Sequence, residues 1–124
     1  MRFYLSSSYL HIGDKAKELP KLMPDNKKIG YIPNACDYTR IDMKRRNDVN
    51  AQDMADLGDL GLWAEMLDLK EYFGRTDALR KKLQSIGGVF VRGGNTFILL
   101  QAMHLSGFDI LFKELLARDD FVYA

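Results

Sequence analysis

Short apolar runs alternate along the chain with longer stretches in which apolar residues recur every three or four positions. The short runs are rich in β-branched and aromatic residues and predict strands over 2–8, 27–33, 62–69, 88–92 and 121–124. The stretches between them predict helices over 15–23, 41–58, 76–85, 95–105 and 108–117. Because strands alternate with helices, we expect an α/β fold with a mostly parallel sheet, arranged as a three-layer α-β-α sandwich.

Residues with special backbone preferences mark the ends of several of these helices. Asp14 is expected to cap the first helix, which Pro20 should make short or kinked. Gly58 or Gly61 can supply the left-handed turn that ends the second helix, and Gly107 separates the last two. The aromatic residues, Trp63 among them, are expected in the core.

Composition narrows the class of protein. The 124 residues fit one domain over 1–124, and 18 basic against 17 acidic side chains leave a charge of +1 that is spread along the chain. This distribution gives no nucleic-acid footprint. Cys36 is the only cysteine, no apolar run approaches the roughly 18 residues of a membrane span, and the start is too polar for a signal peptide. We therefore expect a cytoplasmic location.

Ligands of parallel α/β sheets gather at the carboxyl ends of the strands, which here means 6–8, 34–37, 68–70 and 92–95. The turn Gly93-Gly94-Asn95 lies between a predicted strand and a predicted helix. Its glycines let backbone amides approach a ligand, and the amino end of the helix favours negative charge. The turn therefore predicts a site for an oxyanion or phosphate, although a tight connector without a ligand explains it as well. Its spacing does not fit a dinucleotide fingerprint.

Other chemically capable residues have ordinary structural interpretations. His11 and His104 are far apart and have no ligand-spaced partners, so no metal or cofactor is predicted. Cys36 is interpreted as a small buried residue rather than a nucleophile, and Asp68 as a helix cap or loop residue. Ser106 is interpreted as a helix terminator. The three serines at 6–8 are interpreted as loop formers, with donation to an anion as the alternative.

Four segments in order, MRFYLSSSYL (1–10), IGYIPNA (29–35), LDLKEYFG (67–74) and GVFVRGGNTFILLQAMHLSG (88–107), resemble the peptidase E family. These are serine dipeptidases that cleave after an N-terminal aspartate. The resemblance implies a flavodoxin-like fold similar to that of class I glutamine amidotransferases. It also implies that the turn formed by Gly93, Gly94 and Asn95 supplies an oxyanion-hole amide beside the nucleophile.

In the family, the strand that matches 121–124 runs into a Gly-x-Ser-Ala-Gly nucleophile elbow, and the acidic and histidine members of the triad follow later. The resemblance therefore implies a chain truncated after its fifth strand, with no catalytic residue of its own and unable to hydrolyse alone. The alternative is a non-catalytic module that binds a small anion or peptide. An exposed sheet edge or an uncovered apolar face predicts a homo-oligomer, with neither nucleic acid nor a membrane as partner.

Overall fold

Parallel strands form the centre of the molecule. The computed structural model describes residues 1–7, 13–38, 40 and 42–124. Within these residues the sheet has five strands in the order β1-β5-β4-β2-β3, and every neighbouring pair is parallel. The strands are β1 (Arg2–Phe3), β2 (Lys28–Ile32), β3 (Trp63–Met66), β4 (Gly88–Val91) and β5 (Val122–Tyr123).

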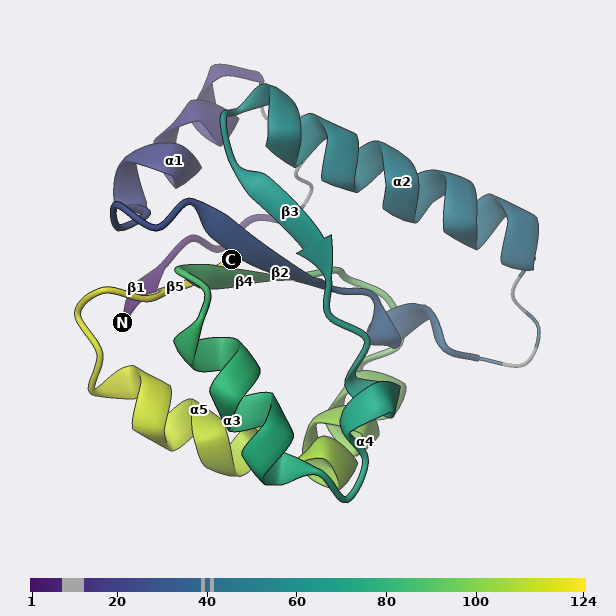
Figure 1. Ribbon diagram of the computed structural model, residues 1–124. Coiled ribbons are helices and arrows are strands. Elements are labelled where there is room, and N and C mark those ends of the chain that lie inside the picture. The colour runs from purple at the N-terminus through teal and green to yellow at the C-terminus, as the bar shows by residue number, and fades with distance from the viewer. Residues whose placement is uncertain (8–12, 39, 41) are drawn as a thin grey trace.

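Helices cover both faces of this sheet (Figure 1). On one face lie α1 (Glu18–Leu22), which follows the 3-10 helix η1 (Gly13–Lys17), and α2 (Met43–Asp59). On the other lie α3 (Thr76–Gln84), α4 (Thr96–Ser106) and α5 (Phe108–Leu116). Two further 3-10 helices, η2 (Asn34–Cys36) and η3 (Leu69–Tyr72), follow β2 and β3. The predicted three-layer α-β-α sandwich with a parallel sheet is confirmed.

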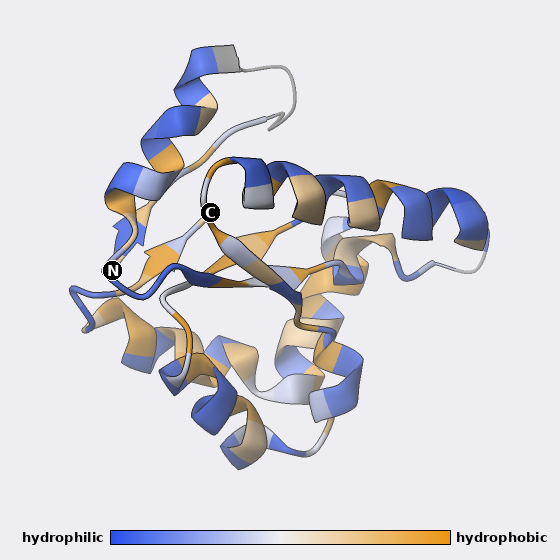
Figure 2. Cartoon of the chain, turned by 45° about the horizontal axis from the view of Figure 1, so that its top comes forward, coloured by the Kyte–Doolittle hydropathy of each residue, from blue (hydrophilic) through white to orange (hydrophobic). Residues whose placement is uncertain are grey.

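Each face of the sheet has its own apolar core, and Figure 2 shows hydrophobic residues gathered on the central strands. The core beneath α3, α4 and α5 contains Ile32, Leu67, Leu79, Val89, Phe108 and Leu111 among others. The core beneath α1 and α2 is smaller and contains Leu19, Ile29, Tyr31, Leu57, Phe90 and Val122 among others. Burial of these side chains, at roughly 1.5–3 kcal/mol each, fixes the helices against the sheet.

Two of the predicted helix ends are confirmed and one is wrong. Gly61 follows α2 with a φ of 85°, and Gly107 joins α4 to α5 with a φ of 78°. Both angles fall in the left-handed region that glycine adopts without steric cost. Asp14 does not cap a helix, because the chain already turns at Gly13 and the Asp14 carboxylate pairs with Lys17 at 2.6 Å. Pro20 lies inside the five-residue α1, which is short as expected.

The outer strands differ most from the sequence prediction. The strand predicted over 2–8 is wrong in length: β1 covers Arg2–Phe3, and in the described sheet it pairs with β5, which is itself two residues long. The prediction that the aromatic residues lie in the core is wrong for several of them: Trp63 is 68% exposed, since β3 lies at the edge of the sheet, and Phe97 on α4 is 84% exposed. The ammonium group of Lys28 lies 5.3 Å from the Trp63 ring centroid and covers part of it. Across the described part of the chain, no helix combines the length and apolarity of a membrane span.

Candidate functional site

The strands β2 and β4 are neighbours, and the chain leaves their carboxyl ends toward opposite faces of the sheet. From β2 it passes through α2 to reach β3, whereas from β4 it passes through α4 and α5 to reach β5 (Figure 1). A crevice opens where two adjacent strands diverge in this way, and it is the usual ligand position in such sheets. The segments that border it are η2 after β2 and the turn 93–95 after β4.

Close backbone contact fixes the turn against η2. The amide of Asn95 donates to the carbonyl of Ala35 at 2.8 Å. A Cβ placed on Gly94 would lie only 2.7 Å from that same carbonyl oxygen, so no larger residue fits without displacing backbone. A Cβ on Gly93 would meet no atom within 4 Å. Gly94 is therefore required by packing, whereas Gly93 faces open space.

The first turn of α4 receives its cap from Asn95. The side-chain oxygen of Asn95 accepts hydrogen bonds from the amides of Phe97 at 3.0 Å and Ile98 at 3.2 Å. By contrast, the amides of Gly93 and Gly94 have no hydrogen-bond partner among the described residues. Two donors thus remain available directly before the positive end of an 11-residue helix, where a negatively charged oxygen is stabilised.

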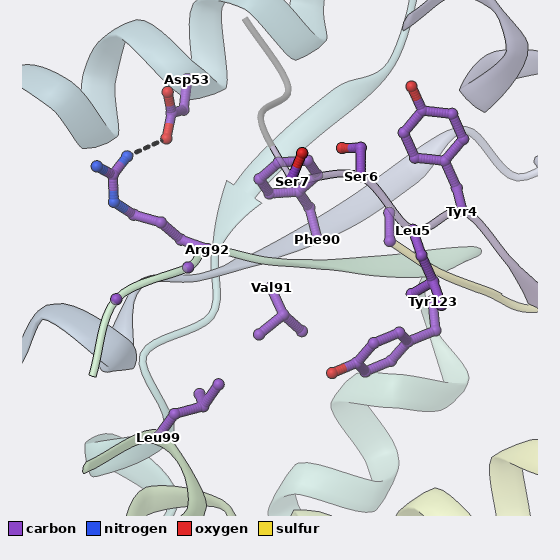
Figure 3. A pocket seen from close by; sticks show the side chains of 13 residues that line it. Tyr4, Leu5, Ser6, Ser7, Asp53, Phe90, Val91, Arg92, Leu99 and Tyr123 are labelled. Carbon is purple, nitrogen blue, oxygen red and sulfur yellow. Dashed lines mark hydrogen bonds and ion pairs between the residues drawn. The ribbon is translucent and has the colours of Figure 1, made fainter. Parts of the chain in front are cut away.

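Gly93 and Gly94 line a cavity of about 580 Å³ at the carboxyl ends of β1, β4 and β5 (Figure 3). Its polar lining consists of Tyr4, Ser6, Ser7, Asp53, Arg92 and the two glycines. Its apolar lining comes from Leu5, Phe90, Val91, Leu99 and Tyr123. The structure therefore places Gly93, Gly94, Ser6 and Ser7 around one space. The side chain of Asn95 is engaged in the helix cap, so an oxyanion role for Asn95 stays a prediction.

A buried charge network adjoins the cavity. The Arg92 guanidinium forms an ion pair with Asp53 of α2 through Nη1, and its Nε lies 3.4 Å from the Cys36 sulfur. The Tyr31 hydroxyl donates to Asp53 at 2.7 Å and lies 3.1 Å from the Asn50 side-chain oxygen. Burial, followed by the hydrogen bond to Asp53, raises the pKa of Tyr31. Burial lowers the pKa of Arg92, but its hydrogen bonds to Tyr31 and Cys36 and the nearby negative charge outweigh this and raise it.

Sequence analysis missed the Asp53 network, although a signal for it exists. Asn50, Asp53 and Leu57 are the buried residues of α2 and recur at helical spacing. Two polar residues therefore occupy positions where an amphipathic helix normally places apolar ones. Polar residues on the buried face of a helix indicate that polar partners lie opposite them, and here the partners of Asp53 are Tyr31 and Arg92.

A second polar cluster joins the carboxyl ends of β2 and β3. The Asn34 amide nitrogen donates to Asp37 at 2.6 Å and to Asp68 at 2.8 Å, and its oxygen accepts from the Leu69 amide at 3.0 Å. Asp68 also accepts from the amide of Lys70 at 3.0 Å and caps η3, as the sequence predicted. With its bonds satisfied internally, this cluster holds η2 in position rather than offering a ligand site.

The remaining candidates have structural roles. Cys36 is buried, as expected. Ser106 is also buried; its hydroxyl donates to the Met103 carbonyl at 3.2 Å and accepts from the Phe108 amide at 3.3 Å, which confirms it as a helix terminator. His104 is exposed, with Nδ1 3.0 Å from an Asp109 oxygen. Ser8 and His11 lie outside the described residues. Within those residues, no three His, Cys, Asp or Glu side chains are grouped to hold a metal ion.

The protein is a parallel α/β sandwich with two available backbone amides where the strands β2 and β4 diverge. Proteins of this class can stabilise a bound anion or an oxyanion that develops during a reaction. The model of Peptidase family S51 matches residues 3–124. The chain therefore belongs to peptidase family S51, and the resemblance to the peptidase E family drawn from the sequence is confirmed.

A solved structure has the same fold. It is that of a "Putative Peptidase E Protein" from Listeria monocytogenes EGD-e, which superimposes with a TM-score of 0.71 at 24% sequence identity. The match covers 98% of the present chain and 56% of the Listeria chain, so the present chain spans little more than half the length of that protein. A search of curated proteins finds no match.

Proposed function

We propose that this chain forms the oxyanion-binding part of a peptidase E-like serine hydrolase that acts on Asp-X dipeptides. The observation that carries the proposal is the pair of Gly93 and Gly94 amides, which lie before α4, border the cavity and have no partner among the described residues. In peptide hydrolysis the carbonyl oxygen of the scissile bond becomes negatively charged, and two preorganised amide donors stabilise that charge. Membership of peptidase family S51 supports this reaction class.

The proposal assigns a different task to each residue of the turn. Gly93 leaves space above its backbone, so a substrate carbonyl can approach. Gly94 packs against Ala35 and fixes the direction of the turn, while Asn95 fixes the start of α4. These contacts hold the donors before the ligand arrives, and the reaction then needs no reorganisation of the turn.

The 124-residue polypeptide by itself is proposed to be inactive as a peptidase. Among the described serines, the hydroxyls of Ser85 and Ser106 donate to backbone carbonyls, and Ser6 and Ser7 have no hydrogen bond to His104, the described histidine. A serine nucleophile requires a base within hydrogen-bond reach to accept its proton. An oxyanion site without such a pair stabilises charge but does not create it. We also propose a cytoplasmic location, because a single cysteine cannot form the intrachain disulfides typical of oxidising compartments.

A second candidate function is a non-catalytic module that binds a small anion or peptide. It is favoured by two amides without a partner beside a cavity, together with the absence of a hydrogen bond between any described serine and any described histidine. Under this alternative the chain would hold an acidic peptide at 93–94 without cleaving it.

Two experiments on the 124-residue polypeptide test these functions. The first is a backbone amide NMR titration with Asp-Leu. We expect the Gly93 and Gly94 resonances to shift, while Gly61 and Gly87, whose amides already donate to Gly58 and Lys28, serve as internal controls. Unchanged Gly93 and Gly94 resonances at saturating peptide would remove the basis of both candidate functions.

The second experiment measures turnover of aspartyl p-nitroanilide and labelling by a fluorophosphonate. We expect neither from the 124-residue polypeptide. Turnover that resists repurification, with label on a serine of this chain, would contradict the proposed inactivity. Binding of Asp-Leu together with no hydrolysis by any longer form of the protein would favour the binding module over the peptidase.

A further inference from the structure

Arg92 provides a cation at the wall of the cavity, directly before the two available amides. Its side chain is 26% exposed, so the guanidinium is neither sealed in the core nor free in solvent. Figure 3 shows it extending from the end of β4 toward Asp53 on α2, on the opposite side of β4 from Leu99. Nothing in the proposed oxyanion role of Gly93 and Gly94 uses this charge.

Only part of the guanidinium is occupied by protein groups. Nη1 pairs with Asp53 and lies 3.5 Å from the Tyr31 hydroxyl, and Nε faces the Cys36 sulfur. Nη2 has no partner among the described residues and is not among their buried unpartnered atoms. An arginine presents five donors in a planar fork, so at least one donor nitrogen remains for a ligand.

Asp53 holds the guanidinium at a fixed angle. Its side chain is 6% exposed and accepts from both Arg92 and the Tyr31 hydroxyl. Because Asp53 is buried on α2 together with Asn50 and Leu57, its carboxylate is held in place beside Arg92. The pair thus orients the arginine and also cancels its charge.

We propose that Arg92 binds a carboxylate of the ligand in this cavity, and that the hydrogen bond to Asp53 orients Arg92 while the negative charge of Asp53 weakens its hold on the ligand. The proposal rests on the proposed function only for the identity of the ligand, an acidic dipeptide. A planar carboxylate matches the geometry of a guanidinium. Among the described lining residues, Arg92 and Asp53 carry the charged side chains and offset one another, and Ala124 adds the terminal carboxylate of the 124-residue polypeptide. The cavity therefore suits a singly charged group better than a doubly charged phosphate.

Asp-Leu carries two carboxylates, and matched ligands separate them. Asn-Leu lacks the side-chain carboxylate, and aspartyl-leucinamide lacks the terminal one. Titration calorimetry of the 124-residue polypeptide with these three ligands and with inorganic phosphate gives their affinities. We expect one of the two modified peptides to bind at least about tenfold more weakly than Asp-Leu, as loss of a charge-assisted hydrogen bond predicts.

Substitution then assigns the effect to Arg92. Arg92→Gln should weaken Asp-Leu at least about tenfold and abolish the difference between Asp-Leu and the weaker of its two analogues. Arg92→Lys should restore part of that difference, because it keeps the charge and loses the fork. Arg80→Gln is the matched control, since Arg80 makes its ion pairs with Asp77 and Glu114 on the helices α3 and α5.

Asp53→Asn gives a prediction that a purely structural role of Arg92 does not make. It removes the negative charge that competes with the ligand but retains a side-chain oxygen that can accept from both Tyr31 and Arg92, so the orientation of Arg92 is kept. We expect Asp-Leu to bind this variant several-fold more tightly than the wild type, and its melting temperature to rise further when Asp-Leu is added. Equal or weaker binding by a folded Asp53→Asn variant would count against the proposal.

One measurement needs no variant and applies even if a substitution prevents folding. The Nε resonance of Arg92 in the wild-type polypeptide should shift on addition of Asp-Leu. If the Gly93 and Gly94 amides respond and Arg92 Nε does not, or if phosphate binds more tightly than any carboxylate, the proposal is wrong while the oxyanion role stands. If succinate binds through Arg92 and Asp-Leu does not bind, the proposed substrate is wrong while Arg92 remains a carboxylate site.

Discussion

Replacement of Gly94 by alanine is the sharpest test of the packed turn, because the neighbouring Gly93 provides a control of identical chemistry. A Cβ on Gly94 would lie 2.7 Å from the carbonyl oxygen of Ala35, 3.0 Å from its carbonyl carbon and 3.1 Å from its Cβ. Ordinary contact begins at 3.4 Å, so the oxygen is 0.7 Å too close. Ala35 is buried in η2, between Asn34 and Cys36, and has no space into which to retreat.

The turn must therefore move away from η2, and the hydrogen bond from the Asn95 amide to Ala35 lengthens or breaks. Overpacking of this kind costs roughly 1–3 kcal/mol. For a domain of this size each kcal/mol lowers the melting temperature by about 4 °C, so Gly94→Ala should melt about 4–12 °C below the wild type. Gly93→Ala adds a methyl group to open space and should change the free energy of unfolding by less than about 0.5 kcal/mol.

Thermal and urea unfolding followed by circular dichroism measure both variants under the same conditions. A second readout, the NMR shift of the turn amides with Asp-Leu, should be reduced in Gly94→Ala even at temperatures where the variant is fully folded. Equal stabilities for the two alanine variants would show that the turn is not held against Ala35, and the argument for a preorganised oxyanion site would fail with it.

Three other outcomes are expected. Gly107→Ala should lose roughly 1–3 kcal/mol in urea unfolding, because φ is 78° and the new Cβ would lie 2.7 Å from the Thr76 methyl carbon. The pKa of Tyr31 is higher in the folded protein than its value near 10 in the unfolded chain. Its contribution to the free energy of unfolding is therefore complete below about pH 10 and decreases as the pH rises above that value. When urea unfolding is measured from about pH 8 to 11, the free energy of unfolding of Tyr31→Phe should decrease less with pH than that of the wild type. If the chain self-associates, as the sequence predicts, Phe97→Ser with Leu100→Ser should shift sedimentation toward the monomer, since these α4 side chains are 84% and 56% exposed; an unchanged oligomer would place the interface elsewhere.

Local patterns in the sequence account for most of the fold. Helical spacing of Leu79 and Leu83 and the apolar run before Gly93 place α3 and β4 to within a residue or two of the structure. The exposure of Trp63 could not be predicted this way, because it depends on β3 being at the edge of the sheet. The length of β1 likewise depends on β5, about 120 positions away in the sequence. Pairing between distant strands is a property of the assembled sheet, and no local window contains it.

The site divides in the same way. Gly93 and Gly94 were found because a glycine pair between a strand and a helix is a local pattern. Asp53 was missed because its role depends on Arg92, 39 residues later, and on Tyr31 in a different strand. Only the parallel pairing of β2 with β4, with α2 above them, brings these three side chains together.

The placement of polar residues in α2 bears on function as well as on stability. Buried ion pairs contribute little net stability, because desolvation offsets their attraction, and well-packed apolar residues of similar size often stabilise as much or more. An α2 with leucine at the positions of Asn50 and Asp53 would extend the apolar core over β2 without requiring Arg92. Instead, the ion pair with Asp53 anchors Arg92, the residue before Gly93. Asn34 and its partners anchor η2 on the other side of the turn. Polar contacts from both sides thus fix the turn at the switch point, which is the arrangement that stabilisation of a developing charge requires.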